Sequence, residues 1–239
     1  MMTTTIFAVV ALVLHGSPSV ADSRSNTAEV KPLSVRGDAR LTAAQLEGWY
    51  ATTRRTPRLT SGITIGDLAR LYVQEGNAER IRGDVAFAQA ILETGDFTFP
   101  RAGQARSSDN NFAGLGACDT CTTAARFPTA RDGVRAQIQL LRVYVDNSVH
   151  TTALANTPTP SPSGSETTHT ASTFDQVGRG HETTWESLGS GQWASAAKYG
   201  TTILAIYRSM LSFAATKQIR HLSGPEPAVL AEGSARSIG

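Results

Sequence analysis

Apolar residues recur every three or four positions along several stretches of the chain, which is the spacing of one face of an α-helix. The pattern predicts helices over residues 41–53, 64–77, 84–94, 132–147 and around 203–213. Between positions 97 and 132, Gly, Asn and Asp interrupt short apolar pieces, which indicates loops and a small β-hairpin. The sequence therefore predicts a mostly α fold of the α+β type.

Local signals mark where these helices should begin and end. Thr64 is followed three positions later by Asp67, a pairing that caps a helix start, and Gly76 would close the same helix. Asp84 is the expected N-cap of the next helix, and Gly95 should stop it.

The helix over 84–94 places a single acid, Glu93, at the end of an otherwise apolar run. Burying a carboxylate is costly, and the C-terminal end of a helix disfavours negative charge. Both effects should raise the pKa of Glu93 and keep it protonated, as a general acid requires. Gln89 lies one turn earlier on an adjacent face. A solvated helix end is the alternative interpretation of Glu93.

The segments outside the helices predict the organisation of the chain. Residues 6–14 are apolar but too short to cross a bilayer, which takes roughly 20 residues, and they suit a signal peptide. No Lys or Arg precedes them, so a stray apolar N-terminus is the alternative. We expect a signal peptide over 1–21, a disordered leader over 22–40, one domain over 41–216 with a Pro/Ser/Thr-rich surface loop at 151–173, and a flexible tail over 217–239.

The composition fits one globular domain, with 40% hydrophobic and 18% charged residues and a formal net charge of +2. This balance argues against a nucleic-acid binder, which would show a concentrated basic face. The arginines Arg54, Arg55 and Arg58 could attract anionic polymers, or form a solvated loop. The five histidines show no ligand spacing, so we predict no metal and no cofactor.

Both cysteines, Cys118 and Cys121, lie in the stretch "CDTC". Two thiols do not complete a tetrahedral zinc site, and the surrounding residues lack the strand-then-helix pattern of a redox centre. In an exported protein the simplest interpretation is a small structural disulfide, and free thiols are the alternative.

Four blocks of the chain resemble, in order, the glucosaminidase family of cell-wall hydrolases (glycoside hydrolase family 73). They are "AFAQAILETG", "DNNFAGLGA", "GVRAQIQLLRVY" and "WASAAKYGTTILAIYRSM", and the similarity covers about 41–215. The resemblance implies a lysozyme-like helical body with a smaller lobe and a cleft between them. It also implies a secreted, wall-associated hydrolase that cleaves the β-1,4 bond between N-acetylglucosamine and N-acetylmuramic acid in peptidoglycan strands. We expect a monomer without a stable membrane span.

The same resemblance assigns roles to single residues. Glu93 matches the general acid of the family, and Tyr199 matches a tyrosine that lines the cleft. The expected sugar-binding residues are Gln89, Asn110, Asn111 and Phe112. The alternative interpretations are a core aromatic for Tyr199 and turn residues for the two asparagines.

The second catalytic group is open. Some members of the family use another glutamate from the small lobe, but no glutamate lies between positions 93 and 166. Asp119 is the best-placed acid, with Asp109 and Asp132 as alternatives. Otherwise the N-acetyl group of the substrate assists, oriented by Asn111 or Tyr199. A muramidase, a lytic transglycosylase and an inactive wall-binding module are the rival functions.

Overall fold

The structure is a computed structural model of the 239-residue chain. It describes residues 31–101, 103–117, 124–146, 154–156, 183–189, 193–194 and 196–222. These residues form α1 (Ala43–Thr52), α2 (Ile65–Glu79), α3 (Gly83–Thr94), η1 (Ser107–Asp109), α4 (Ala130–Val145), η4 (Ser187–Gly189) and α5 (Tyr199–Leu222). The prediction of a mostly helical fold is confirmed.

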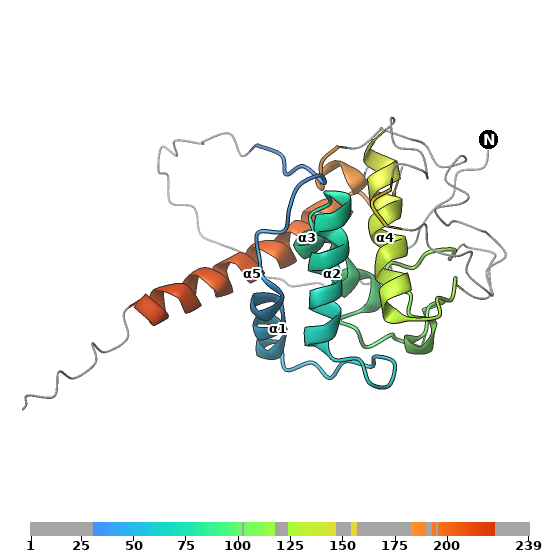
Figure 1. The fold of residues 1–239 in the computed structure, drawn as a ribbon, viewed down its shortest axis with the longest axis horizontal. Coiled ribbons are helices and arrows are strands. Elements are labelled where there is room, and N and C mark those ends of the chain that lie inside the picture. Colours follow the sequence, from blue (N-terminus) through green and yellow to red (C-terminus); the bar gives the residue numbers. More distant parts are fainter. Residues whose placement is uncertain are drawn as a thin grey trace, which may run out of the picture.

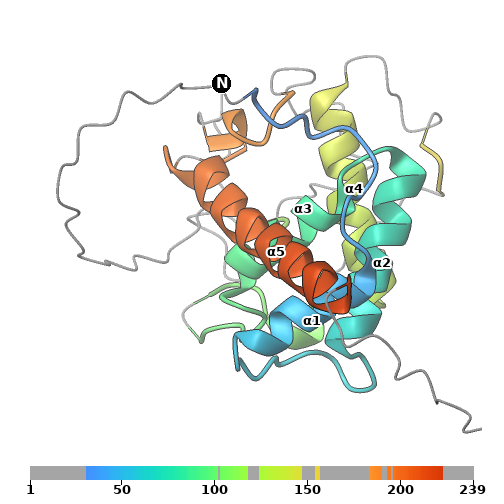
Figure 2. The same ribbon diagram turned by 90° about the vertical axis from the view of Figure 1, so that its left-hand side faces the viewer.

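Helix α3 is the centre of the core. Ten of its twelve residues are buried, which fits its apolar sequence. Helices α2, α4 and α5 all pack against it, while α1 packs against α2 and α5. Figure 1 shows α2 and α4 side by side with α5 running away from them, and Figure 2 shows α5 passing in front of α3. Residues at both ends of α3 can therefore meet side chains from several helices.

Three helices begin with the same capping device. In each, a threonine side chain accepts from the backbone N–H of the residue three positions later, and the side chain of that residue accepts from the backbone N–H of the threonine. The pairs are Thr42 with Gln45, Thr64 with Asp67, and Thr129 with Asp132. The predicted cap at Thr64 is confirmed, and so is the stop of α3 at Gly95, which has a φ of 57°.

Two predicted helix boundaries are wrong. Helix α2 does not end at Gly76 but continues to Glu79. Gly76 lies inside it because α2 and the start of α3 cross there, and a Cβ on Gly76 would come within 2.6 Å of the Cα of Gly83. The glycine allows a close approach between helices instead of ending one.

Asp84 is not an N-cap, because α3 already begins at Gly83. Its fully buried carboxylate accepts from the backbone N–H groups of Arg40 (2.8 Å) and Leu41 (3.1 Å) and from the hydroxyl of Tyr207 (2.9 Å). Asp84 thus joins the N-terminal segment and α5 to the start of α3.

The expected disordered leader is wrong for residues 31–40. Val35 is fully buried, its N–H donates to Thr183 O (2.9 Å), and its carbonyl accepts from Arg82 N (3.1 Å). The N–H of Leu33 donates to the Glu186 carboxylate at 2.9 Å. One buried valine and these hydrogen bonds are enough to order a mainly polar segment. Helix α5 also runs to Leu222, into the expected tail.

Several predictions fall on residues that the structure does not describe. These are the signal peptide over 1–21, most of the loop at 151–173, and the predicted hairpin with Cys118, Asp119 and Cys121. The described ranges include two isolated β-bridges, between Ser34 and Thr184 and between Arg36 and Ile81. No helix in the described part of the chain is both long and apolar enough to span a bilayer.

Candidate active site

Glu93 lies in the last turn of α3, just before the left-handed Gly95. The residue is partly exposed, but the protein atoms packed around its carboxylate raise the pKa of Glu93 to about 7. A hydrogen bond from Tyr199 acts in the opposite direction and lowers that pKa. Near neutral pH the carboxyl therefore exists in both protonation states, as predicted in direction from the sequence.

Tyr199 is the first residue of α5, and its hydroxyl donates to Glu93 Oε1. The tyrosine is buried, and its oxygen also accepts from Gln89 Nε2 at 2.8 Å and from Trp193 Nε1 at 3.1 Å. Tyr199, in the last of the four sequence blocks, thus contacts Gln89 and Glu93, which lie in the first block. It contacts the acid from within the protein.

Gln89 is fully buried, so it cannot touch a sugar directly as expected from the sequence. Its Oε1 accepts from Gln137 Nε2 at 2.8 Å, and Gln137 Oε1 accepts from the Tyr72 hydroxyl at 2.5 Å. Sequence analysis missed Gln137 and Tyr72. A signal existed for Gln137, because it occupies the same helix face as the buried Val134 and Leu141.

Asn111 is also fully buried, and all its side-chain hydrogen-bonding groups are used. Its Nδ2 donates to the carbonyls of Leu115 (2.8 Å) and Ala125 (2.9 Å), and its Oδ1 accepts from the N–H groups of Ala113 (3.3 Å) and Leu115 (3.0 Å). An amide has two donors and two main acceptor positions, so none remains for a substrate. Asn111 shapes the loop over 111–115.

The other two residues of that block are structural as well. Asn110 has a φ of 50°, and its side chain accepts from Thr60 Oγ1 (2.7 Å) and donates to Phe127 O (3.0 Å). Phe112 is buried, with its ring centroid 6.3 Å from those of both Phe97 and Phe99. The turn-residue alternative for Asn110 fits this geometry.

The loop held by Asn111 brings Gly114 against the acid. Gly114 has a φ of 63°, and a Cβ built on it would lie 3.7 Å from Glu93 Oε2. The two carboxylate oxygens of Glu93 therefore have different surroundings. Oε1 receives the Tyr199 hydroxyl, and Oε2 faces a glycine.

Comparison with known proteins identifies the family. A family model described as mannosyl-glycoprotein endo-beta-N-acetylglucosaminidase matches residues 69–212, which is more than half of the chain. The chain belongs to this glucosaminidase family. The match includes every residue of the hydrogen-bonded set described above, namely Tyr72, Gln89, Glu93, Gln137, Trp193 and Tyr199.

An uncharacterized protein of Borreliella burgdorferi is 32% identical to the chain over 80 residues. The alignment covers 34% of this chain and 38% of that protein, so the chain matches well under half of its relative's length. The search of solved structures returned no match.

Of the three aspartates predicted as the second catalytic group of this glucosaminidase-family chain, the structure describes Asp109 and Asp132. Asp119 lies outside the described residues. Asp109 is buried, accepts from Arg106 N at 2.8 Å and pairs with Arg126 at 3.4 Å. Asp132 is used in the cap of α4. Both described aspartates thus have structural partners.

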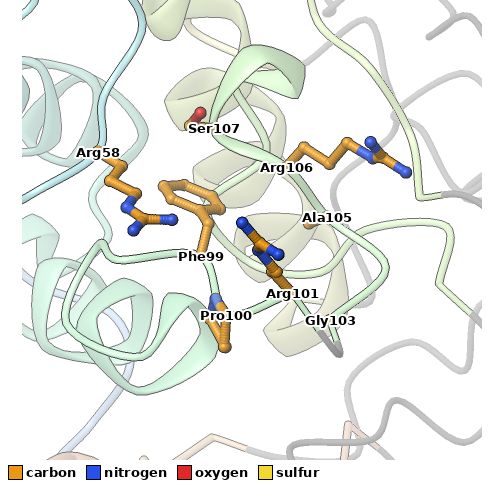
Figure 3. A pocket seen from close by; sticks show the side chains of 8 residues that line it. All are labelled: Arg58, Phe99, Pro100, Arg101, Gly103, Ala105, Arg106 and Ser107. Atoms are coloured by element: carbon orange, nitrogen blue, oxygen red, sulfur yellow. The ribbon is translucent and has the colours of Figure 1, made fainter.

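A cavity of about 390 Å³ lies in the loop that follows α3. Arg58, Arg101 and Arg106 line it, and none of its lining residues is acidic. Figure 3 shows Arg58 and Arg101 beside the ring of Phe99, with the Arg106 guanidinium directed away. Pro100 at its edge would meet a Cβ on Gly95 at 3.4 Å, so the cavity begins close to the end of the helix that carries Glu93.

Among the residues that the structure describes, no three His, Cys, Asp or Glu side chains gather closely enough to hold an ion.

Proposed function

We propose that this chain is an exported peptidoglycan hydrolase, an endo-β-N-acetylglucosaminidase that cleaves the β-1,4 bond between N-acetylglucosamine and N-acetylmuramic acid. The observation that carries the proposal is the carboxyl of Glu93, whose pKa is raised to about 7 by burial. Cleavage of a glycosidic bond needs a proton on the leaving oxygen, and a carboxyl that is neutral near pH 7 supplies it. The family membership supports the same chemistry.

The reaction also needs a group that stabilises or attacks the sugar carbon. Asp119 serves as the base in one version of the proposal, and the substrate's own N-acetyl group acts in the other. In both versions Glu93 protonates the leaving oxygen. The two versions differ in the effect of Asp119→Asn, which removes activity in the first and leaves most of it in the second.

The arginine-lined cavity supports an anionic substrate. Arg58 and Arg101 flank a partly apolar floor formed by Phe99, and peptidoglycan carries carboxylates on its lactyl groups and peptides. Guanidinium groups bind carboxylates well because their N–H groups can form two parallel hydrogen bonds. The cavity would then hold the peptide-bearing part of a strand near Glu93.

The test is digestion of purified peptidoglycan, followed by borohydride reduction and mass spectrometry of the new reducing ends. Wild type should release N-acetylglucosamine ends, and Glu93→Gln should be slower by about 10²- to 10⁴-fold, the usual contribution of a general acid. Glu47→Gln is the matched control, because Glu47 is exposed on α1. Muramic acid ends would indicate a muramidase, and anhydro ends a lytic transglycosylase. Sedimentation with the wall without any release would indicate a binding module.

Export is a separate part of the proposal. It rests on the apolar run at 6–14 and the small residues before Asp22. Fusion of residues 1–21 to a reporter that is active only outside the cytoplasm tests it, with the same fusion carrying Val9→Arg and Val10→Arg as the control. Equal reporter signals from both fusions would contradict export through this segment.

A further inference from the structure

The buried hydrogen bonds behind Glu93 form a chain with a fixed direction. The starting point is the backbone carbonyl of Ala86, which lies 3.3 Å from the amide nitrogen of Gln137. A carbonyl only accepts, so the NH₂ group of Gln137 must face it. The same NH₂ group reaches Gln89 Oε1 at 2.8 Å, and the oxygen of Gln137 is left to accept from the Tyr72 hydroxyl at 2.5 Å.

The orientation of Gln137 determines that of Gln89. Because Gln89 Oε1 accepts from Gln137, its NH₂ group is directed at the Tyr199 oxygen, 2.8 Å away. The indole N–H of Trp193 also donates to that oxygen, at 3.1 Å, and an indole nitrogen cannot accept. Tyr199 therefore receives two hydrogen bonds that cannot be reversed.

A phenol has one proton to donate and two lone pairs to accept with. Since both lone pairs of Tyr199 are occupied, its only remaining interaction is donation, and the acceptor is Glu93 Oε1. A proton on Oε1 would have no acceptor on Tyr199 and would make Oε1 a poorer acceptor for the phenol, whereas a proton on Oε2 leaves Oε1 as the carbonyl oxygen that accepts. The hydrogen bonds of Tyr199 therefore favour Oε2, the oxygen that faces Gly114, as the place of the proton when Glu93 is protonated.

We propose that Gln89, Gln137 and Tyr72 are positioning residues that fix the acidic proton of Glu93 on Oε2, through the hydroxyl of Tyr199. The delivery of that proton to a glycosidic oxygen rests on the proposed function, whereas its location does not. Because the proton and both lone pairs of the Tyr199 hydroxyl are already used, this residue has no group with which to orient a substrate acetamide. Asn111 has none either, so substrate assistance would require another residue.

Few titratable groups in the described part of the chain interact with Glu93. They are Tyr199 on α5 and Tyr72 on α2, and the loop from the opposite side presents Gly114. Burial raises the pKa of both tyrosines well above 10, so both keep their protons at any pH at which the acid titrates. The direction of the chain is then the same before and after Glu93 ionises.

The experiment measures the titration of Glu93 without substrate, by carbon NMR of the protein labelled at its glutamate carboxyls, with the signal assigned through Glu93→Gln. Gln89→Met removes one donor to Tyr199 and frees a lone pair of its oxygen, so a proton on Oε1 gains an acceptor. The form of Glu93 protonated on Oε1 then adds to the protonated population, and the phenol becomes a weaker donor to the carboxylate. Both effects should raise the midpoint of the Glu93 titration. We expect a rise of about one pH unit in Tyr199→Phe, a smaller rise in Gln89→Met, and the smallest in Tyr72→Phe.

The matched control is Tyr207→Phe, which removes another buried phenol hydroxyl that donates to a carboxylate of α3, but at Asp84. It should lower stability without moving the Glu93 midpoint. An unchanged midpoint in folded Gln89→Met, or an equal shift in Tyr207→Phe, would overturn the proposal. If Gln89→Met does not fold, the Glu93 midpoint is measured in Tyr72→Phe, and an unchanged midpoint there would overturn the proposal. Because no substrate is involved, these results are independent of whether the chain cleaves peptidoglycan.

Discussion

Gly114 lies against the carboxylate of Glu93, and a Cβ atom built on it would be 3.7 Å from Oε2. That oxygen is the one that Tyr199 does not contact. The absence of a side chain at position 114 therefore leaves space beside the oxygen that carries the proton in the proposed reaction. The loop holds this position because the Asn111 side chain bonds the backbone on both sides of it, at Ala113 and Leu115.

Gly114→Ala should reduce hydrolysis because the new methyl group covers part of Glu93 Oε2. It should also lower stability by about 1–2 kcal/mol, since Gly114 has a φ of 63° and alanine is strained there. Gly62→Ala separates the two effects, because Gly62 has a φ of 84° with nothing within 4 Å of an added Cβ. Urea unfolding and hydrolysis rates of both variants test this. Equal activities in the two variants would contradict a role for the space at Gly114.

The rate of hydrolysis should fall as the pH rises through about 7. In the proposed reaction the protonated form of Glu93 is the active one, and its pKa is raised to about 7. Tyr199→Phe should move this descending limb to higher pH, because it removes the hydrogen bond that lowers the pKa. The measurement is kcat/KM against pH for both proteins. A limb at the same pH in the two proteins would contradict the assignment of Glu93 as the titrating acid.

The stability of the protein should depend on pH in the direction opposite to that of an ordinary ion-paired carboxylate. The pKa of Glu93 is about 7 in the folded state, against 4.5 as the usual value. Between these two values the folded chain holds a proton that the unfolded chain has lost, so stability decreases as pH rises through the window and levels off above it. Urea unfolding at pH 4.5, 6 and 8 should show this loss in wild type and not in Glu93→Gln. The same dependence of the unfolding free energy on pH in both proteins would contradict this prediction.

Much of the helical part of this fold could be predicted, because helix signals are local. The caps at Thr64 and Gly95 and the position of Glu93 at a helix end follow from neighbouring residues. The ordering of residues 31–40 could not, since its hydrogen-bond partners lie more than forty positions away in the sequence, at Thr183 for Val35 and at Asp84 for Arg40.

The raised pKa of Glu93 could be predicted from the sequence, but the hydrogen-bond partners around it could not. The hydroxyl of Tyr199, which was expected to line the cleft, donates to Glu93. Gln89 and Asn111 were expected at the sugar and are instead fully buried. The sequence shows that a polar residue is present, but whether its amide points to solvent or to backbone groups depends on the partners that folding brings to it.

Asn111→Asp should destabilise the protein without changing the apparent KM. The substitution keeps an acceptor for the Ala113 and Leu115 N–H groups but directs an oxygen at the carbonyls of Leu115 and Ala125. The loss should be about 3 kcal/mol, because buried groups are left without donors. The control is Asn77→Asp on the exposed side of α2, where the side chain accepts from Ala39 N and an aspartate would still do so. A raised KM with unchanged stability in Asn111→Asp would instead support direct sugar binding.

Charge reversal in the arginine-lined cavity should weaken binding to peptidoglycan. Arg58→Glu and Arg101→Glu each replace a guanidinium beside Phe99 by a carboxylate, which repels the acidic groups of the polymer. Arg208→Glu on α5 changes the net charge equally at an exposed residue outside the cavity. Sedimentation with peptidoglycan at low salt should show several-fold weaker binding for the cavity variants alone. The difference should shrink at high salt, where exposed charges are screened. If Arg208→Glu weakens binding as much, net charge and not the cavity attracts the polymer.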